Sequence, residues 1–117
     1  MGTERKARAL RFFSEVSTPP FTVEGKREAF RLLRLLQLGE NIGLPTSRPM
    51  QIIGNRCHEL RMQDAKHNWR IVYHLAPDAV LILGVFPKKT QKTPKNQIDT
   101  CKERLKRYLD EIKKAKS

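Results

Sequence analysis

Three strand-like stretches follow one another with very little chain between them. Residues 57–63, 69–76 and 79–87 are alternating or continuously apolar, and short turn-forming segments separate them. Parallel neighbours would need a crossover connection of a dozen or more residues, which these short links cannot provide. The three stretches are therefore expected to form an antiparallel meander, and the rest of the chain must pack around it.

Side-chain alternation divides the first two of these strands into an apolar face and a polar face. Residues two apart in a strand lie on the same side of the sheet. Leu60 and Met62 thus share one side of the first strand, and Ile71, Tyr73 and Leu75 share one side of the second. These apolar sides should face helices. The opposite face is expected to present Glu59, Arg61, Arg70 and His74.

The third strand, residues 79–87, is apolar on both sides and is expected to lie centrally. It runs into residues 87–94, a cationic segment that we call the tongue. The tongue contains three lysines and three other side-chain donors: Lys88, Lys89, Thr90, Gln91, Lys92 and Thr93. Such donors at the end of a rigid strand suit phosphate oxygens, although a solvated basic loop would have the same composition.

Two segments outside the meander have the spacing of amphipathic helices. Residues 24–38 repeat apolar positions at helical intervals and precede Gly39, a natural C-terminal stop. The basic second face of this helix is either solvated surface or part of a polyanion-binding rim. Residues 94–114 form the second helix, with Thr93 as its expected N-cap and Pro94 at its first position.

Two further segments complete the expected fold. Residues 8–16 are assigned to a first strand rather than a helix, because Phe12 and Phe13 favour a pleated surface. Residues 41–49 contain a glycine and two prolines and are expected to form a surface loop.

These elements predict a single α+β domain spanning residues 1–117. An antiparallel sheet, with its meander in residues 50–87, would be packed on one face by the N-terminal helical segment. A C-terminal helix would complete the domain.

The charge of the chain points to a polyanionic or acidic partner. Lys and Arg number 24 against 12 Asp and Glu, which gives a net charge of +12. From Lys88 onward, 11 basic residues face 4 acidic ones, so much of the excess lies in the last quarter of the chain. A field of this kind attracts nucleic acid and makes the binding strongly salt-dependent.

The two cysteines and the hydropathy pattern suggest a cytoplasmic protein. Cys57 and Cys101 are too few and too far apart for a disulfide framework or a zinc ribbon, so reduced thiols are expected. No signal peptide is visible, and no apolar run approaches the roughly 18 residues of a membrane span.

Metal-free RNA cleavage needs a base for the 2′-hydroxyl proton, cations for the phosphate charge and an acid for the leaving oxygen. The charge could come from five residues: Arg61, Arg70, Lys88, Lys89 and Lys92. For proton transfer the candidates are His74, Glu59, Tyr73 or a lysine whose pKa is lowered by cationic neighbours. The sequence does not choose between them.

Structural roles are open for several of the same residues. Arg61 and Arg70 could pair with Glu59 and Asp64 across the hairpin. Trp69 could pack in the core or stack on a base.

The histidines do not suggest a metal site. His58 falls on the apolar side of its strand and fits a core role, and His67 lies in a turn. Together with His74 they lack metal-ligand spacing, so neither a metal nor another cofactor is expected.

Four segments together resemble the HigB-type toxins of bacterial toxin–antitoxin modules, within the wider RelE/ParE superfamily. These segments are Met50–Gly54, Glu59–Arg61, Trp69–Tyr73 and Phe86–Pro94. The lysine-threonine signature after an apolar strand is fairly specific, and the resemblance covers roughly residues 10–110.

The resemblance implies a RelE-like fold and a metal-independent, ribosome-dependent endoribonuclease that cuts mRNA. It also implies neutralisation by a cognate antitoxin, usually a HigA-like helix-turn-helix protein. Arg61 and Arg70 match basic strand positions that act on the scissile phosphate, and Lys88 or Lys89 matches the basic residue after the last strand. The RNA-contacting candidates are Trp69, Tyr73, Thr90, Gln91 and Lys92.

The chain departs from the RelE pattern at two positions. Well-studied RelE-type enzymes carry two lysines on the strand that here contains Cys57 and Glu59, neither of which is basic. Two other functions therefore remain open: inhibition of DNA gyrase without cleavage, as ParE relatives are held to act, and RNA or ribosome binding without turnover.

Overall fold

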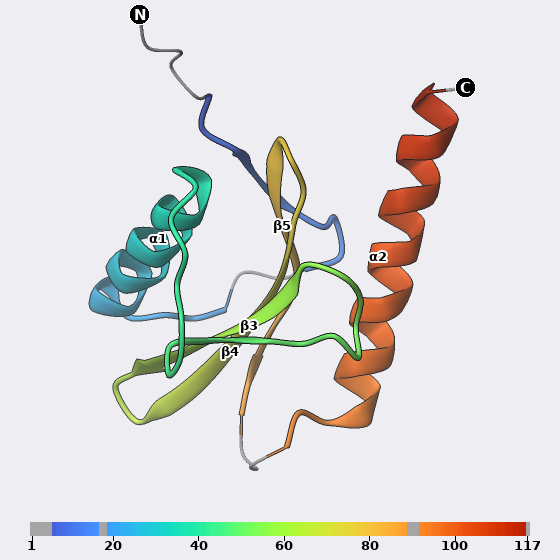
Figure 1. Ribbon diagram of the computed structural model, residues 1–117. Coiled ribbons are helices and arrows are strands. Elements are labelled where there is room, and N and C mark those ends of the chain that lie inside the picture. The colour runs from blue at the N-terminus through green and yellow to red at the C-terminus, as the bar shows by residue number, and fades with distance from the viewer. Residues whose placement is uncertain (1–5, 17–18, 89–91, 117) are drawn as a thin grey trace, which may run out of the picture.

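The computed structural model describes residues 6–16, 19–88 and 92–116 of the chain. Five strands and two helices follow in the order β1 (Ala9–Phe12), α1 (Val23–Gln37), β2 (Ser47–Pro49), β3 (Cys57–Asp64), β4 (His67–Leu75), β5 (Ala79–Pro87) and α2 (Lys95–Lys116). The strands form one sheet in the order β1-β5-β4-β3-β2 (Figure 1). The predicted α+β class is confirmed.

The predicted meander is present. β3 pairs antiparallel with β4, and β4 pairs antiparallel with β5. Its register places Arg61 opposite Arg70, and Arg70 opposite Phe86. β5 has a neighbour on each side, which agrees with its continuously apolar sequence.

The sheet is mixed, so the prediction of a wholly antiparallel sheet was wrong. β1 runs parallel to β5, with Ala9 opposite Ala79 and Phe12 opposite Ile82. Parallel pairing is possible here because most of the chain lies between the two strands and supplies the long crossover. β1 is also shorter than the predicted segment 8–16, since a turn closed by the Val16 N–H and the Phe13 carbonyl follows it.

The segment 41–49 is not entirely a loop, because its last three residues form β2 along the edge of β3. Ser47 lies opposite Leu60, and Arg48 lies opposite Glu59. Pro49 is tolerated at this outer position because proline lacks only the N–H that an edge strand can leave unused. This short strand brings Arg48 onto the sheet.

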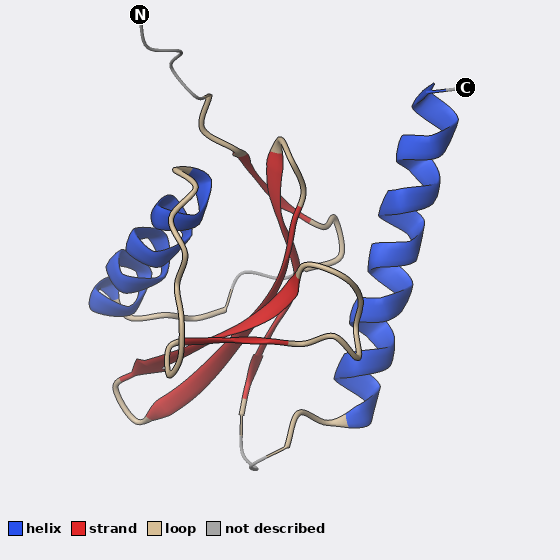
Figure 2. Ribbon diagram, in the orientation of Figure 1, coloured by secondary structure: helices blue, strands red, loops and turns tan. Residues whose placement is uncertain are grey.

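The two helices lie on opposite sides of the sheet, as Figure 2 shows. α1 contributes Ala29, Leu32, Leu33 and Leu36 to a core with one sheet face. α2 packs through Cys101 and Leu105 against the other face. Of the helices in the described ranges, none is both long and apolar enough to cross a membrane.

The start of α1 is tied to the end of β3. Thr22 is the N-cap, and its hydroxyl oxygen accepts the Gly25 N–H at 3.0 Å. The Thr22 hydroxyl also donates to Asp64 Oδ1, and the Thr22 N–H donates to Asp64 Oδ2 at 2.8 Å. These hydrogen bonds lower the pKa of the Asp64 carboxyl, because they favour its charged form.

Gly25 has no room for a larger side chain at this junction. A Cβ built there would lie 2.4 Å from the Asp64 carboxyl, whereas one on Gly43 would meet nothing within 4 Å. Alanine normally favours a helix by about 1 kcal/mol over glycine. We nevertheless expect Gly25→Ala to lower the free energy of unfolding in urea by about 1–3 kcal/mol, as overpacking does. Gly43→Ala is the control and should be nearly neutral; equal effects of the two variants would refute the steric account.

Candidate nucleic-acid interface

Four cationic side chains gather on the sheet face that α2 only partly covers. Arg48 comes from β2, Arg61 from β3, Arg70 from β4, and Lys88 directly follows β5. Strand register brings them together, and the Lys88 N–H is fixed by a 2.8 Å hydrogen bond to the Asn68 carbonyl. We call Arg48, Arg61, Arg70 and Lys88 the cationic cluster.

The carboxylate of Glu59 lies inside this cluster and is fully buried. Its Oε1 is 3.4 Å from Arg48 Nε and 3.6 Å from Arg70 Nε. Its Oε2 accepts a 2.6 Å hydrogen bond from Thr93 Oγ1. Buried carboxylates are normally paired and hydrogen-bonded; here Oε2 is hydrogen-bonded, whereas Oε1 is stabilised by its two ion pairs and makes no hydrogen bond to a described residue. With no exposed surface, Glu59 holds the cluster together rather than facing a substrate.

The cluster carries more positive charge than Glu59 can neutralise. Within the described ranges, no acceptor makes a hydrogen bond to the buried Nε–H groups of Arg48, Arg61 and Arg70. No carboxylate of the described residues lies within ion-pair distance of Arg61. Buried donors without acceptors are uncommon in folded proteins and call for an explanation. Arg48 and Arg70 share the carboxylate of Glu59, and Arg61 has none among the described residues, so the cluster keeps positive charge for an incoming phosphate.

Lys88 has a perturbed ammonium group. Partial burial lowers its pKa, and the nearby charge of Arg70 lowers it further, while Glu59 acts in the opposite direction. Burial likewise lowers the pKa of Arg70. Of the lysines in the described ranges, Lys88 is therefore the one that matches the predicted candidate base, a lysine whose pKa is lowered by cationic neighbours.

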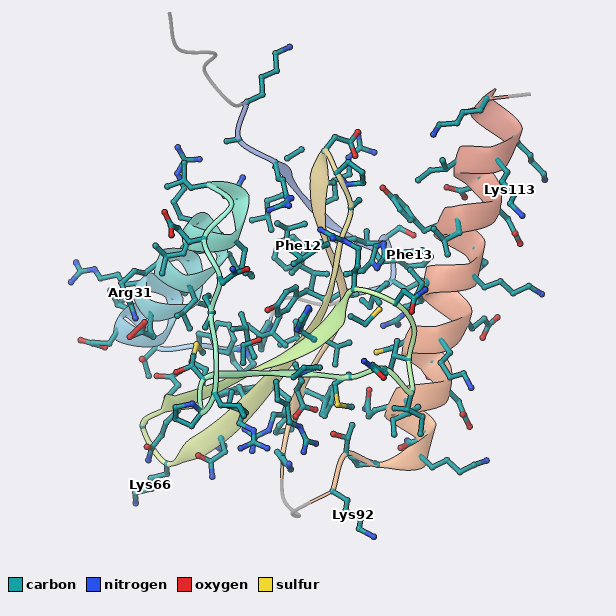
Figure 3. All side chains as sticks on the ribbon, viewed as in Figure 1. Phe12, Phe13, Arg31, Lys66, Lys92 and Lys113 are labelled. Carbon is teal, nitrogen blue, oxygen red and sulfur yellow. The ribbon has the colours of Figure 1, made fainter. Side chains whose placement is uncertain are left out.

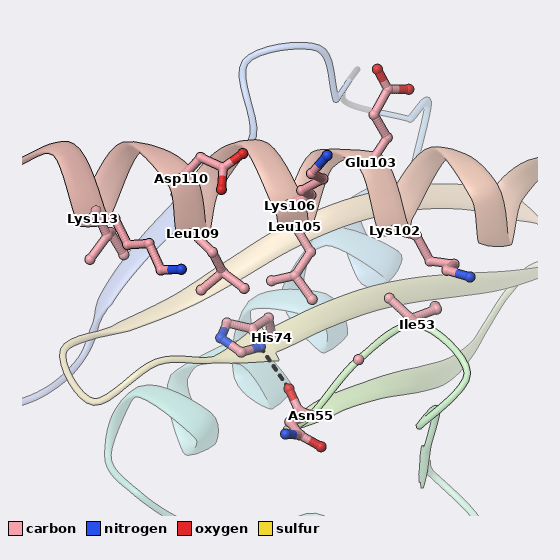
Figure 4. A pocket seen from close by; sticks show the side chains of 12 residues that line it. Ile53, Asn55, His74, Lys102, Glu103, Leu105, Lys106, Leu109, Asp110 and Lys113 are labelled. Carbon is pink, nitrogen blue, oxygen red and sulfur yellow. Dashed lines mark hydrogen bonds between the residues drawn. The ribbon is translucent and has the colours of Figure 1, made fainter.

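His74 shares this sheet face but lies at its other end, so the structure does not bring it to the arginines. Figure 4 shows it beneath α2, near Leu105 and Leu109. Its Nδ1 is 3.0 Å from the Asn55 carbonyl oxygen. The surrounding pocket of about 860 Å³ is mostly apolar, and burial lowers the pKa of the imidazole.

Trp69 and Tyr73 point into the core on the α1 side, away from the cluster. The Trp69 ring meets the edge of Phe21 at 5.1 Å between centroids. Tyr73 is 1% exposed, and its hydroxyl is 2.7 Å from Ser47 Oγ. Side chains buried in this way support the sheet and offer no exposed ring for a base.

The other candidate residues occupy varied positions. Lys92 is exposed and lies on the segment that leads into α2 (Figure 3). Lys89, Thr90 and Gln91 lie outside the described residues. His58 is half-buried and stacks on the Tyr73 ring at 5.3 Å, which suits the expected packing role.

The alternative pairings of the arginines are partly realised. Arg70 lies at ion-pair distance from Glu59, as the hairpin arrangement allowed. Asp64 instead caps α1 through Thr22. Among the described residues, no group of three or more His, Cys, Asp or Glu side chains could hold a metal ion.

Sequence reasoning missed two features of this site. Arg48 was hidden in a segment that reads as a loop, and only its pairing with Glu59 across the sheet edge reveals it. Thr93 was expected to cap the C-terminal helix, but its hydroxyl donates to Glu59. The Pro94 carbonyl instead accepts the N–H groups of Gln97 and Ile98.

Fold and site together define a small basic α+β protein with a cluster of cations on one sheet face. The phage-derived protein Gp49-like family (DUF891) matches this chain over residues 21–106, from before α1 into α2. The chain belongs to this family, which comprises RelE/HigB-like toxins of toxin–antitoxin systems. Membership implies a cognate antitoxin as a partner. A comparison with curated proteins gives no significant match.

Loss of the Thr93 hydroxyl should weaken the fold through Glu59. Thr93→Val is nearly isosteric but leaves the buried Oε2 without its hydrogen bond, and bonds to charged groups are worth about 1.5–3 kcal/mol. We expect a loss of that size in the free energy of unfolding measured in urea. Thr93→Ser keeps a hydroxyl and should retain most of the stability; equal losses in both variants would show that the methyl group, not the hydrogen bond, matters.

Proposed function

We propose that this protein is the HigB-type toxin of a type II toxin–antitoxin system and acts as a metal-independent, ribosome-dependent mRNA endoribonuclease. The observation that carries the proposal is the cationic cluster, in which Arg48 and Arg70 share one carboxylate, that of Glu59. Arg61 has no carboxylate within ion-pair distance among the described residues. The Gp49-like family supports a toxin function. A net charge of +12 favours association with the RNA-rich ribosome.

In the proposed reaction, the arginines hold the scissile phosphate. Arg61 and Arg70 lie opposite each other on neighbouring strands, so their guanidinium groups are pre-organised on a rigid sheet. The 2′-oxygen loses its proton to a base and attacks phosphorus, and the bond from phosphorus to the 5′-oxygen breaks. A 2′,3′-cyclic phosphate results, and the leaving 5′-oxygen takes a proton from water to become a hydroxyl. Negative charge grows on the phosphate oxygens during this step, and the arginines stabilise it.

Lys88 is the residue that we assign to proton transfer. Its lowered pKa raises the fraction of neutral amine, which can accept the proton of the 2′-hydroxyl. Glu59 is fully buried, and His74 lies under α2. This assignment provides a base although Cys57 and Glu59 stand where RelE-type enzymes carry lysines.

The partners follow from this activity. The substrate is mRNA on translating ribosomes in the cytoplasm, and the antitoxin is a small HigA-like helix-turn-helix protein. Covering the basic surface with an antitoxin would block phosphate access and neutralise the toxin.

Primer extension on a reporter mRNA tests the proposal directly. Purified protein is incubated with the message in the presence and absence of translating ribosomes, with EDTA in the ribosome-free reactions. We expect discrete cuts that require ribosomes and that weaken by roughly 10²–10³-fold in Arg61→Ala and Arg70→Ala. Lys66→Ala is the control, because Lys66 is exposed on the β3–β4 turn. Intact message from a protein that still arrests growth would contradict the proposal.

Ribosome binding and a gyrase assay with the wild-type protein separate the two other functions. Binding without turnover predicts that ribosomes retain the wild-type protein but their message stays uncut. Inhibition of DNA gyrase predicts loss of supercoiling activity when the protein is added to the purified enzyme. Arrest of gyrase with no cleavage would replace the nuclease by the ParE-like activity.

The pH dependence of cleavage tests the role of Lys88. If neutral Lys88 is the base, the single-turnover rate should rise with pH up to its pKa, which lies below that of an ordinary lysine. Lys88→Arg keeps the charge but cannot supply a neutral amine, so we expect cleavage to fall by about 10²–10⁴-fold with ribosome binding retained. A wild-type rate that falls as pH rises would assign Lys88 the role of acid instead.

A further inference from the structure

A second open groove adjoins the cationic cluster. It has a volume of about 420 Å³ and lies between the segment after β2 and the start of α2. Its lining includes Pro49, Met50, Gln51, Ile52, Thr93 and Ile98. Arg48 also lines it, so this arginine belongs to both the groove and the cluster. Thr93 joins them as well, through its hydrogen bond to Glu59.

One wall of the groove is a fixed turn that presents an apolar side chain to solvent. The Met50 N–H donates to the Cys57 carbonyl at 2.8 Å, which attaches the turn to β3. The Ile53 N–H donates to the Met50 carbonyl at 2.9 Å and closes the turn. Gln51 and Ile52 occupy its tip, and Ile52 is 61% exposed. The turn therefore fixes the position of the Ile52 side chain beside the groove.

The chemistry of the groove matches a nucleobase. Pro49, Met50, Ile52 and Ile98 offer apolar surface for the flat face of a base. The Gln51 amide carries both donors and an acceptor, which is what hydrogen bonding to a base edge requires. Four of the eight described residues that line the groove are apolar, and the other four are Arg48, Gln51, Lys92 and Thr93. This mixed lining suits a nucleotide, which has a flat apolar base and an anionic phosphate, better than phosphate alone.

We infer that this groove is the subsite for a nucleobase next to the scissile phosphate, and that Gln51 and Ile52 contribute to the nucleotide preference of cleavage. The inference rests on the proposed nuclease function and adds a ligand class and a location to it. A phosphate bound at Arg48 and Arg70 places the attached nucleoside beside the groove. Base packing on Ile52 and hydrogen bonding to Gln51 then discriminate among the four bases.

Binding of small nucleotides tests the subsite independently of catalysis. The four nucleoside 3′-monophosphates are titrated into isotope-labelled full-length protein, with ribose 5-phosphate and inorganic phosphate as ligands without a base. We expect every nucleotide to shift the Ile52 and Ile98 methyl signals and the Gln51 side-chain amide, by amounts that differ among the bases. The two ligands without a base should shift only signals of the cationic cluster.

Matched variants connect these shifts to affinity. Ile52→Ser should weaken nucleotide binding by roughly fourfold, the loss expected for one methylene-sized apolar contact, while inorganic phosphate affinity stays unchanged. Val23→Ser is the control, because Val23 is also β-branched and is 62% exposed. Gln51→Ala should reduce the differences among the four bases, with Gln63→Ala as its exposed control on β3.

The outcomes distinguish this inference from the proposed function. Identical shifts for nucleotides and ribose 5-phosphate, or no nucleotide binding, would overturn the subsite even if the protein cuts mRNA. Base-dependent shifts at Gln51 and Ile52 from a protein that leaves mRNA intact would uphold the groove as a nucleobase site but reject the nuclease, and with it the role of the groove in the nucleotide preference of cleavage. Base-dependent shifts together with cleavage whose nucleotide preference changes in Gln51→Ala would support both.

Discussion

The buried carboxylate of Glu59 is the interaction on which the cationic face depends. Arg48 and Arg70 carry like charges, and on neighbouring strands they would repel each other without an anion between them. Glu59 lies at 3.4 and 3.6 Å from their Nε atoms, and its second oxygen accepts from Thr93. One side chain thus links the edge strand β2, the central strand β4 and the segment that leads into α2. Removing the charge would leave the cations unbalanced rather than merely delete one contact.

The distribution of residues over the sheet explains how one domain combines a core with an anion site. The α1 face of the meander is mostly apolar, and Tyr73 and Trp69 belong to it. The opposite face is divided along its length. α2 covers the end that holds Cys57, and Cys101 of the helix packs there. Burial raises the pKa of Cys57 to about 12 and that of Cys101 to about 11, so both thiols are poorly reactive. The other end is left to the arginines and Lys88.

Much of the fold was predictable because short-range rules govern it. Alternation placed Glu59, Arg61 and Arg70 on one face, and helical spacing located α1 and α2 to within a few residues. The parallel pairing of β1 and the strand β2 were not predictable, because each depends on partners distant in sequence. The place of Arg48 in the site was not predictable for the same reason, because this residue lies on β2. The alternation of side chains placed His74 on the same face as Arg61 and Arg70. It gave no information on where α2 crosses that face, and the helix lies over His74.

The central claim is that Glu59 and the four surrounding cations form one electrostatic unit. The most direct measurement is the titration of the Lys88 ammonium, followed by ¹⁵N NMR in the wild type and in Glu59→Gln. The account predicts a wild-type pKa below that of an ordinary lysine, because burial and Arg70 both disfavour the charge. It predicts a still lower pKa in Glu59→Gln, because the neutral amide no longer attracts the ammonium. Cooperative unfolding of this variant in urea verifies that it is folded. An ordinary lysine pKa in the wild type, or one that the substitution leaves unchanged, would contradict the account.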